Sequence, residues 1–264
     1  MSGVSNPPTV LITGAAGGLG RVLATAFLSQ GANVAVCDIN DDRLAETSNL
    51  WAEQYSGKFL VHKTDVSSLS DTECLIRSVT DKFGRLDILI NNAAVLDKFD
   101  SAGTCSLEIW NNTLRVNLTG AFICTKVAVN TMQAQIPPGG SIINIGSNAS
   151  VLGVSAGLAY TVSKHGILAL TRSTAAFYLE HDITCMMLQL GALQSTNMQD
   201  TMADGVNLEG LGMIEKYMPR FKPGFSDVPL ADVAKFCVML MDRDLAKTLN
   251  GAAVPLNRNW PAGI

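Results

Sequence analysis

Three polar side chains in the middle of the sequence have the types and spacing for acid–base chemistry. Tyr160 and Lys164 are four residues apart in a stretch that predicts a helix, so their side chains share one helix face. An ammonium beside a phenol stabilises the phenolate and lowers the phenol pKa toward neutral pH. Ser147 follows a predicted strand 13 residues before Tyr160, at the carboxyl edge of the sheet, where ligands bind in open α/β sheets. The pattern predicts Tyr160 as a general acid and base.

A glycine-rich turn near the N-terminus is suited to holding a phosphate. Residues 13–20 read Thr-Gly-Ala-Ala-Gly-Gly-Leu-Gly and separate a predicted strand from a predicted helix. Glycines allow a tight turn and let an anion approach the unpaired N–H groups at the start of the helix. The spacing of Gly14, Gly18 and Gly20 differs from G-x-G-x-x-G, and no Lys-Ser/Thr pair follows, so this is not a Walker A loop. A turn whose glycines serve packing alone is the alternative.

Asp38 ends the second predicted strand, 18 residues after the glycine turn. A carboxylate at this place accepts hydrogen bonds from both hydroxyls of an adenine ribose and repels a 2′-phosphate. It therefore favours NAD(H), while NADP(H) stays possible because Arg21 and Arg43 lie nearby in the sequence. The alternative role for Asp38 is to cap the following helix, which Asp41 or Asp42 could do instead.

The elements that must position these residues alternate along the chain. Apolar runs predict strands at Thr9–Thr13, Asn33–Cys37, Phe59–Lys63, Leu86–Ile90, Ser141–Ile145, Ile183–Leu190 and Ala252–Leu256. Amphipathic stretches predict helices at Arg21–Gln30, Arg43–Tyr55, Ser70–Phe83, Glu108–Gln135, Ala159–Leu179 and Asp232–Met241. Strands that are apolar throughout and alternate with helices are typical of a parallel α/β sheet, here in one domain.

Composition excludes several classes of protein. The 264 residues are 47% hydrophobic and 16% charged, and the net charge of −4 argues against a nucleic-acid binder. No apolar run reaches the roughly 18 residues of a membrane span. Six cysteines without a C-x-x-C pair, and an N-terminus without a signal sequence, predict a cytoplasmic protein with reduced thiols. The three histidines lack metal-ligand spacing, so no metal site is expected.

Residues 196–228 interrupt the alternation of strands and helices. This segment contains no clear strand and is rich in methionine and aromatic residues. A long insertion of this composition predicts a substrate lid, because flexible apolar side chains suit an adaptable pocket. The expected substrate is then apolar and of medium size. A pair of ordinary surface helices with a methionine-rich inner face is the alternative.

Together these motifs resemble the short-chain dehydrogenases/reductases in their compact single-domain form, over roughly residues 8–260. The resemblance implies one doubly wound Rossmann-type domain spanning residues 1–264, with about seven parallel strands flanked by helices on both faces. The catalytic tetrad that it implies is Asn117, Ser147, Tyr160 and Lys164. The cofactor contacts that it implies are Gly14, Gly18, Leu19, Gly20, Asp38, Asp65, Val66, Asn92, Ala93, Tyr160, Lys164, Leu193 and Ser195.

The resemblance also implies a role for each tetrad residue. Tyr160 would exchange a proton with the substrate oxygen, which Ser147 would orient. Lys164 would tune Tyr160 and bind the nicotinamide ribose. Asn117 would hold a water that links Lys164 to solvent, and a buried asparagine bonded to the backbone is compatible with that role. A homo-oligomer, dimer or tetramer, is expected to form through the two long helices that carry Asn117 and Tyr160.

Three departures from the family pattern keep the function open. Ala94 stands where the family has Gly, Leu190 replaces the Pro of a Pro-Gly pair, and Asn257–Trp260 replaces Asp-Gly-Gly. The first hypothesis is an NAD(H)-dependent alcohol dehydrogenase or carbonyl reductase acting on a secondary alcohol or ketone. The second is a biosynthetic enzyme of secondary metabolism that reduces an imine or iminium or couples reduction to cyclisation. The third is a non-catalytic, nucleotide-sensing protein.

Overall fold

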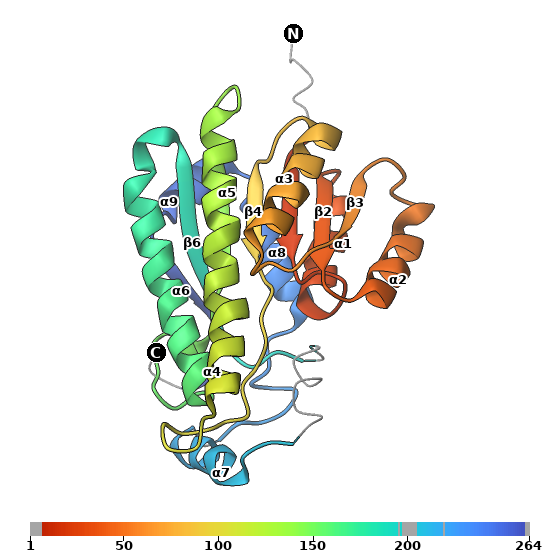
Figure 1. The fold of residues 1–264 in the computed structure, drawn as a ribbon. Coiled ribbons are helices and arrows are strands. Elements are labelled where there is room, and N and C mark those ends of the chain that lie inside the picture. Colours follow the sequence, from red (N-terminus) through yellow and green to blue (C-terminus); the bar gives the residue numbers. More distant parts are fainter. Residues whose placement is uncertain (1–6, 195, 197–204, 219, 262–264) are drawn as a thin grey trace.

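The computed structural model describes residues 7–194, 196, 205–218 and 220–261 of the chain. The strands in this part form one seven-stranded sheet in the order β3-β2-β1-β4-β5-β6-β7, and every neighbouring pair is parallel. Their bounds are β1 (Thr9–Thr13), β2 (Asn33–Asp38), β3 (Phe59–Lys63), β4 (Ile88–Asn91), β5 (Gly140–Ile145), β6 (Ile183–Leu190) and β7 (Ala253–Leu256). The predicted doubly wound α/β fold is confirmed (Figure 1).

Helices cover both faces of the sheet. One face packs against α1, α8 and α9, and the other against α3, α5 and α6. The helix bounds are α1 (Gly18–Ser29), α2 (Asp41–Ala52), α3 (Leu69–Phe83), α4 (Leu107–Leu114), α5 (Ala121–Ala134), α6 (Leu158–Phe177), α7 (Leu208–Tyr217), α8 (Leu230–Met239) and α9 (Arg243–Thr248). None of the helices in these described ranges has both the length and the apolar character that crossing a membrane requires.

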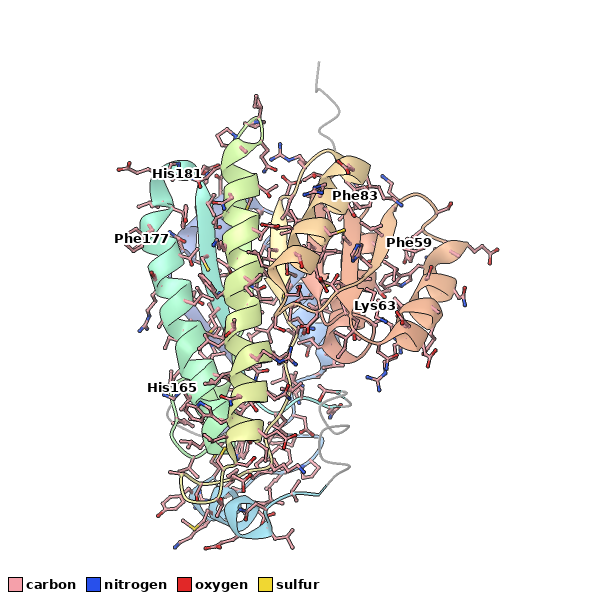
Figure 2. The ribbon with its side chains drawn as sticks, in the orientation of Figure 1. Phe59, Lys63, Phe83, His165, Phe177 and His181 are labelled. Carbon is pink, nitrogen blue, oxygen red and sulfur yellow. The ribbon has the colours of Figure 1, made fainter. Side chains whose placement is uncertain are left out.

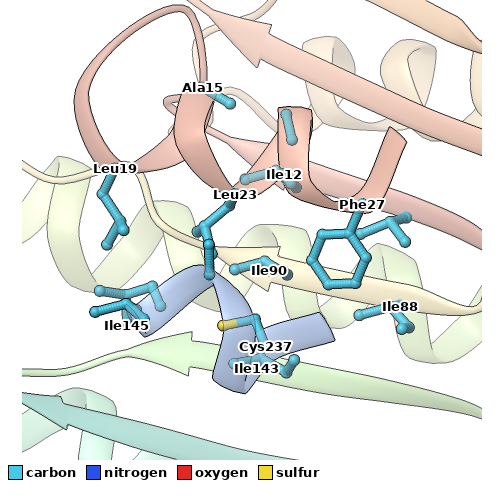
Figure 3. Close-up of a cluster of buried hydrophobic side chains, with 14 of the residues drawn as sticks. Ile12, Ala15, Leu19, Leu23, Phe27, Ile88, Ile90, Ile143, Ile145 and Cys237 are labelled. Carbon is cyan, nitrogen blue, oxygen red and sulfur yellow. The ribbon is translucent and has the colours of Figure 1, made fainter. Parts of the chain in front are cut away.

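The core beneath α1 fixes where the glycine turn lies. Leu23 and Phe27 of α1 are fully buried against Ile12 of β1 and Ile90 of β4, and Cys237 of α8 closes the cluster (Figure 3). Burying a side chain of this size contributes about 2 kcal/mol. Because α1 is anchored in this way, the turn before it stays at the carboxyl ends of β1 and β4.

The chain order creates a crevice at that edge of the sheet. From β1 the chain continues to β2 and β3 on one side, whereas from β4 it continues to β5, β6 and β7 on the other. In open α/β sheets ligands bind where the strand order reverses, outside the carboxyl ends of the strands. The site therefore lies around the segments that follow β1, β4 and β5.

The predicted helix Glu108–Gln135 is not one continuous α-helix. It consists of α4 and α5 joined by the π-helical segment η1 (Arg115–Gly120). Within η1, Gly120 lies so close to Val66 that an added Cβ would come within 2.7 Å of the Val66 Cγ2. Single π-helical turns occur frequently at functional sites, and this one contains Asn117. The sequence pattern also failed to predict α9 and placed β4 two residues too early.

The described residues of the predicted lid segment contain one helix, α7. It lies beyond the lower ends of α4 and α6 in Figure 1. Val228, at the end of the segment, forms an isolated parallel bridge with Leu193, which follows β6. Ser195 and residues 197–204 and 219 lie outside the described residues.

Candidate active site

Ser147 and Tyr160 meet at the carboxyl edge of the sheet. Ser147 follows β5 and caps the short helix η2 (Asn148–Ser150), where its hydroxyl accepts a hydrogen bond from Ala149 N at 3.1 Å. The Ser150 hydroxyl in turn accepts from Ser147 N at 3.1 Å. This reciprocal cap fixes the Ser147 backbone. Tyr160 comes from the first turn of α6, is 7% exposed, and has a side-chain hydrogen bond with Ser147.

Lys164 lies one helical turn after Tyr160 on the same face of α6. Its ammonium donates a 2.8 Å hydrogen bond to the Ile145 carbonyl at the end of β5 and lies 5.4 Å from the centre of the Tyr160 ring. The side chain is 3% exposed, and burial lowers the pKa of Lys164 to about 8. Burial favours the neutral amine because the surrounding atoms solvate an ammonium less well than water does.

The pKa of Tyr160 is raised above its ordinary value, whereas the sequence predicted that Lys164 would lower it. Burial is the largest cause, the hydrogen bond with Ser147 opposes it, and the negative charge of Asp97 adds to it. Burial outweighs the expected effect of Lys164, whose ammonium bonds the Ile145 carbonyl and lies 5.4 Å from the centre of the Tyr160 ring. The Tyr160 phenol therefore keeps its proton at neutral pH, and it is present as the proton donor.

Both polar atoms of the Asn117 side-chain amide form hydrogen bonds that link η1 to neighbouring segments. Its Oδ1 accepts from Val95 N at 2.8 Å, and its Nδ2 donates to Val95 O at 2.9 Å and to the Ser163 hydroxyl at 3.1 Å. These bonds join the segment after β4 to α6. Asn117 is thus a buried asparagine bonded to the backbone, as considered from the sequence. Its role in a water relay stays a prediction.

The glycine turn has the shape of an anion cradle. Gly14 and Gly18 have φ angles of 60° and 49°, in the region that favours glycine. An added Cβ at Gly14 would lie 2.7 Å from Ala93 Cα. The N-cap of α1 is Gly17, which supplies no side-chain cap, and the first turn contains no acid. The backbone N–H groups of this turn therefore fit the phosphates of a dinucleotide.

Comparison with known proteins agrees with this geometry. A family model described as short chain dehydrogenase matches residues 8–207. The chain belongs to the short-chain dehydrogenase family. The short chain dehydrogenase/reductase dpchG of Colletotrichum higginsianum is 40% identical over 256 residues, covering 97% of this chain and 94% of the relative. The short chain dehydrogenase/reductase dpfgG of Gibberella zeae is 41% identical over 256 residues, covering 96% and 93%.

A solved structure of a levodione reductase has the same fold. It superposes with a TM-score of 0.83, covers 96% of both chains and is 24% identical in sequence. Membership of the short-chain dehydrogenases identifies the chain as an oxidoreductase that uses a nicotinamide cofactor.

Asp38, which the sequence predicts as the ribose contact, is the last residue of β2. Its Oδ2 accepts from Ala16 N at 3.3 Å and its Oδ1 accepts from Asn40 N at 3.1 Å, so the carboxylate lies against the glycine turn. The cap of α2 is Asn40, which accepts from Arg43 N, so neither Asp38 nor its alternatives Asp41 and Asp42 cap this helix. Arg21 forms an ion pair with Glu46 at 2.7 Å.

Asn92 and Ala93 connect the ends of β4 and β1 in this short-chain dehydrogenase. The Asn92 amide donates to the carbonyls of Thr13 and Gly14, both at 2.9 Å, and Ala93 N donates to the Thr13 hydroxyl at 3.1 Å. These two predicted cofactor contacts thus hold the glycine turn in place. Their contact with a cofactor stays a prediction.

Asp65 and Val66 lie between β3 and α3. Asp65 accepts hydrogen bonds from Ser67 and from the Arg115 guanidinium, the latter at 3.0 Å. Burial alone would raise the Asp65 pKa, but the bonds from Ser67 and the charge of Arg115 hold it below its ordinary value. Val66 is buried against Gly120 of η1. Both positions border the edge where the sequence predicts the adenine.

Two of the departures from the family pattern meet in space. Gly191, next to Leu190, donates from its N to Leu256 O at 3.0 Å, and an added Cβ would lie 2.8 Å from Asn257 Cα. Asn257 Nδ2 donates to Asn148 Oδ1 at 3.3 Å, and Asn148 Nδ2 donates to Trp260 O at 2.9 Å. The C-terminal turn is therefore bonded to the residue that follows Ser147.

Sequence reasoning missed the part played by Asp97. Asp97 lies in the segment that follows β4 and is buried against the N-terminus of α6. No signal local to its sequence marks it, because its partners are about 60 residues away. His165, by contrast, is exposed on the outer side of α6, pointing away from the Tyr160 and Lys164 face as expected (Figure 2).

Proposed function

We propose that this chain transfers a hydride between NAD(H) and a secondary alcohol or ketone of an apolar, medium-sized substrate. The observation that carries this proposal is the meeting of Ser147, Tyr160 and Lys164 beside the glycine turn. A phenol, a hydroxyl and an ammonium at one edge of the sheet are the groups that protonate and orient a carbonyl oxygen.

Each residue has a separate task in the proposed reaction. In reduction Tyr160 donates its proton to the substrate oxygen, and in oxidation it accepts that proton back. Ser147 donates a hydrogen bond to the same oxygen and aligns it with the phenol. Lys164 lies behind Tyr160 and stabilises the phenolate that reduction leaves. The nicotinamide cofactor, when bound, supplies or accepts the hydride, while the protein supplies position and electrostatics.

A preference for NAD(H) is supported by the charge at the end of β2. The Asp38 carboxylate lies against the turn that holds the phosphates, where it can accept hydrogen bonds from ribose hydroxyls. A 2′-phosphate would place its negative charge beside that of the Asp38 carboxylate. Arg21, considered from the sequence as a partner for that phosphate, is paired with Glu46.

An apolar substrate is supported by the composition of the lid. Met213, Tyr217 and Phe221 are exposed, and Phe221 packs against Trp260 with the rings tilted by 58° and their centres 4.8 Å apart. Trp260 belongs to the turn that is bonded to Asn148, next to Ser147. This apolar wall on the far side of the site favours a ring system or a branched aliphatic ketone.

Two measurements test the proposal. The purified protein is titrated with NADH and with NADPH by fluorescence, and we expect the tighter dissociation constant for NADH. A panel of cyclic and aliphatic ketones is then assayed with wild type and with Tyr160→Phe. Loss of the phenol proton donor should lower kcat by at least about 10²-fold. Tyr178→Phe removes the same atom at the far end of α6 and should leave kcat unchanged.

The outcomes separate the three functions considered from the sequence. Turnover that survives Tyr160→Phe would favour an iminium substrate, which is already cationic and takes up the hydride without a proton from the enzyme. Cofactor binding without turnover across the panel would favour nucleotide sensing. Failure to bind either nucleotide would refute the proposed reaction.

A further inference from the structure

Asp97 caps the helix that carries Tyr160 from a distant part of the chain. The carboxylate is 2% exposed and lies in the segment between β4 and α4. Its Oδ1 accepts from Gly157 N at 3.1 Å and from Phe99 N at 3.2 Å, and its Oδ2 accepts from Tyr160 N at 2.8 Å. The N-cap residue of α6 is Gly157, which has no side chain to do this. A carboxylate at a helix N-terminus is stabilised by the unpaired N–H groups there.

The packing around this carboxylate is tight. An added Cβ at Gly157 would lie 2.4 Å from Asp97 Oδ1, so glycine is required for the close approach. Immediately beyond, Leu158 N donates to Asp100 O at 2.8 Å. The start of α6 is thereby bonded to the segment after β4 through three backbone N–H groups, and one of them is that of Tyr160.

The same segment also holds the start of the lid helix. Asn207, the N-cap of α7, donates from its N to Lys98 O at 2.8 Å and from its Nδ2 to Asp100 Oδ1 at 2.9 Å. In Figure 1 the yellow connection after β4 runs down to α7 before it enters α4. Residues 97–100 therefore touch both the catalytic helix and the lid.

We propose that Asp97 is a positioning residue, which sets the place of Tyr160 relative to Ser147 by holding the first turn of α6. This inference rests on the proposed hydride transfer, in which Tyr160 moves the proton. A displacement of about 1 Å at a reacting group can cost about 10²-fold in rate. The buried carboxylate is the group that prevents such a displacement here.

Charge provides a second signature of this role. Asp97 faces Tyr160 and raises the phenol pKa, whereas Lys164 faces the same ring from α6. Asp97 itself is faced by Asp100 on its own segment and by Cys105. Removing the Asp97 charge should therefore move the acid limb of the oxidation pH profile toward lower pH, because Tyr160 then ionises more readily.

The test compares Asp97→Asn with Asp242→Asn. Asp242 caps α9 by accepting from the N–H groups of Asp244 and Leu245, so the same chemical change removes a helix cap remote from Tyr160. With the best ketone and alcohol pair from the panel, we expect Asp97→Asn to lower kcat about 10- to 100-fold and to shift the acid limb downward. The dissociation constant for NADH should stay within about twofold. Asp242→Asn should change none of these.

A second variant and a hydrogen-exchange measurement also test the proposal. Gly157→Ala retains the charge but forces the carboxylate away from α6, and it should lower kcat as Asp97→Asn does. Hydrogen exchange in the first turn of α6 should accelerate in both variants, a readout that remains even if no ketone is turned over. Unchanged kcat and pH profile in Asp97→Asn would overturn the proposal, as would unchanged exchange. Failure of the wild type to reduce any ketone would instead refute the proposed function.

Discussion

Because Lys164 is buried, the free energy of unfolding depends on pH, and the substitution Lys164→Met isolates this dependence. Burial lowers the pKa of this ammonium to about 8, from its ordinary value of 10.5. Between these pH values the unfolded chain holds a proton on the amine and the folded chain does not. Unfolding therefore takes up a proton, so the free energy of unfolding rises as the pH increases through this window.

The size of the effect follows from the difference between the two pKa values. The destabilisation is fully present below about pH 8 and is lost by about pH 10.5. A shift of 2.5, which is 10.5 minus 8, corresponds to about 3 kcal/mol. Roughly 1 kcal/mol of this should be recovered between about pH 7 and about pH 9.

Urea unfolding followed by tryptophan fluorescence measures this effect in wild type and Lys164→Met. The quantity to follow is the wild-type minus variant difference in unfolding free energy, which should rise with pH. The buried thiols, whose pKa values burial raises, weaken the fold at alkaline pH in both proteins and cancel in the difference. Lys126→Met, at an exposed lysine of α5, should give a flat difference.

A flat difference for Lys164→Met as well would refute the reasoning. It would mean that water reaches the ammonium in the folded protein and that the 2.8 Å bond to Ile145 O does not hold it in a buried place. The result also bears on catalysis, because an ammonium that is half neutral near pH 8 supports a phenolate at Tyr160 less well above that pH.

Three further predictions concern the cofactor crevice and its supports. Asp38→Asn removes the carboxylate charge that would repel a 2′-phosphate. The ratio of NADPH to NADH affinity in fluorescence titrations should therefore rise about tenfold, or about 1.4 kcal/mol, and an unchanged ratio would contradict the ribose role. Gly20→Ala places a Cβ 2.6 Å from backbone atoms of the turn and should weaken NADH binding at least about tenfold, whereas Gly103→Ala, in open space, should not. Asn117→Ala leaves both backbone groups of Val95 without this partner and should lower the urea-unfolding free energy by about 2–4 kcal/mol.

Local patterns in the sequence were enough to predict the sheet. All seven predicted runs correspond to strands, and the central strands, which are buried on both faces, read as uninterrupted apolar runs. The Tyr160 and Lys164 pair was also predictable from a local pattern, because two residues four apart on a helix share a face. Neither inference needs knowledge of what lies opposite in the fold.

Features that depend on distant contacts could not be predicted in this way. The π-helical turn at η1 coincides with the close approach of Gly120 to Val66, which lies far away in the sequence. The raised pKa of Tyr160 depends on burial and on Asp97, which a pairwise argument with Lys164 leaves out. Asp97 has no local signal for its role because its hydrogen bonds to Gly157 and Tyr160 form only when the segment after β4 lies beside α6.

The four positions proposed as the catalytic tetrad have one support in common, which explains why a small group of residues can set the geometry of the candidate site. Each is bonded to a segment that leaves the carboxyl end of β4 or β5. Those bonds join Asn117 to Val95, Ser147 to Ser150, Tyr160 to Asp97 and Lys164 to Ile145. β4 and β5 are paired in register in the middle of the sheet, so their ends move together. The rigidity that proton transfer needs therefore comes from the sheet, while α6 and η1 bring the reacting groups to it.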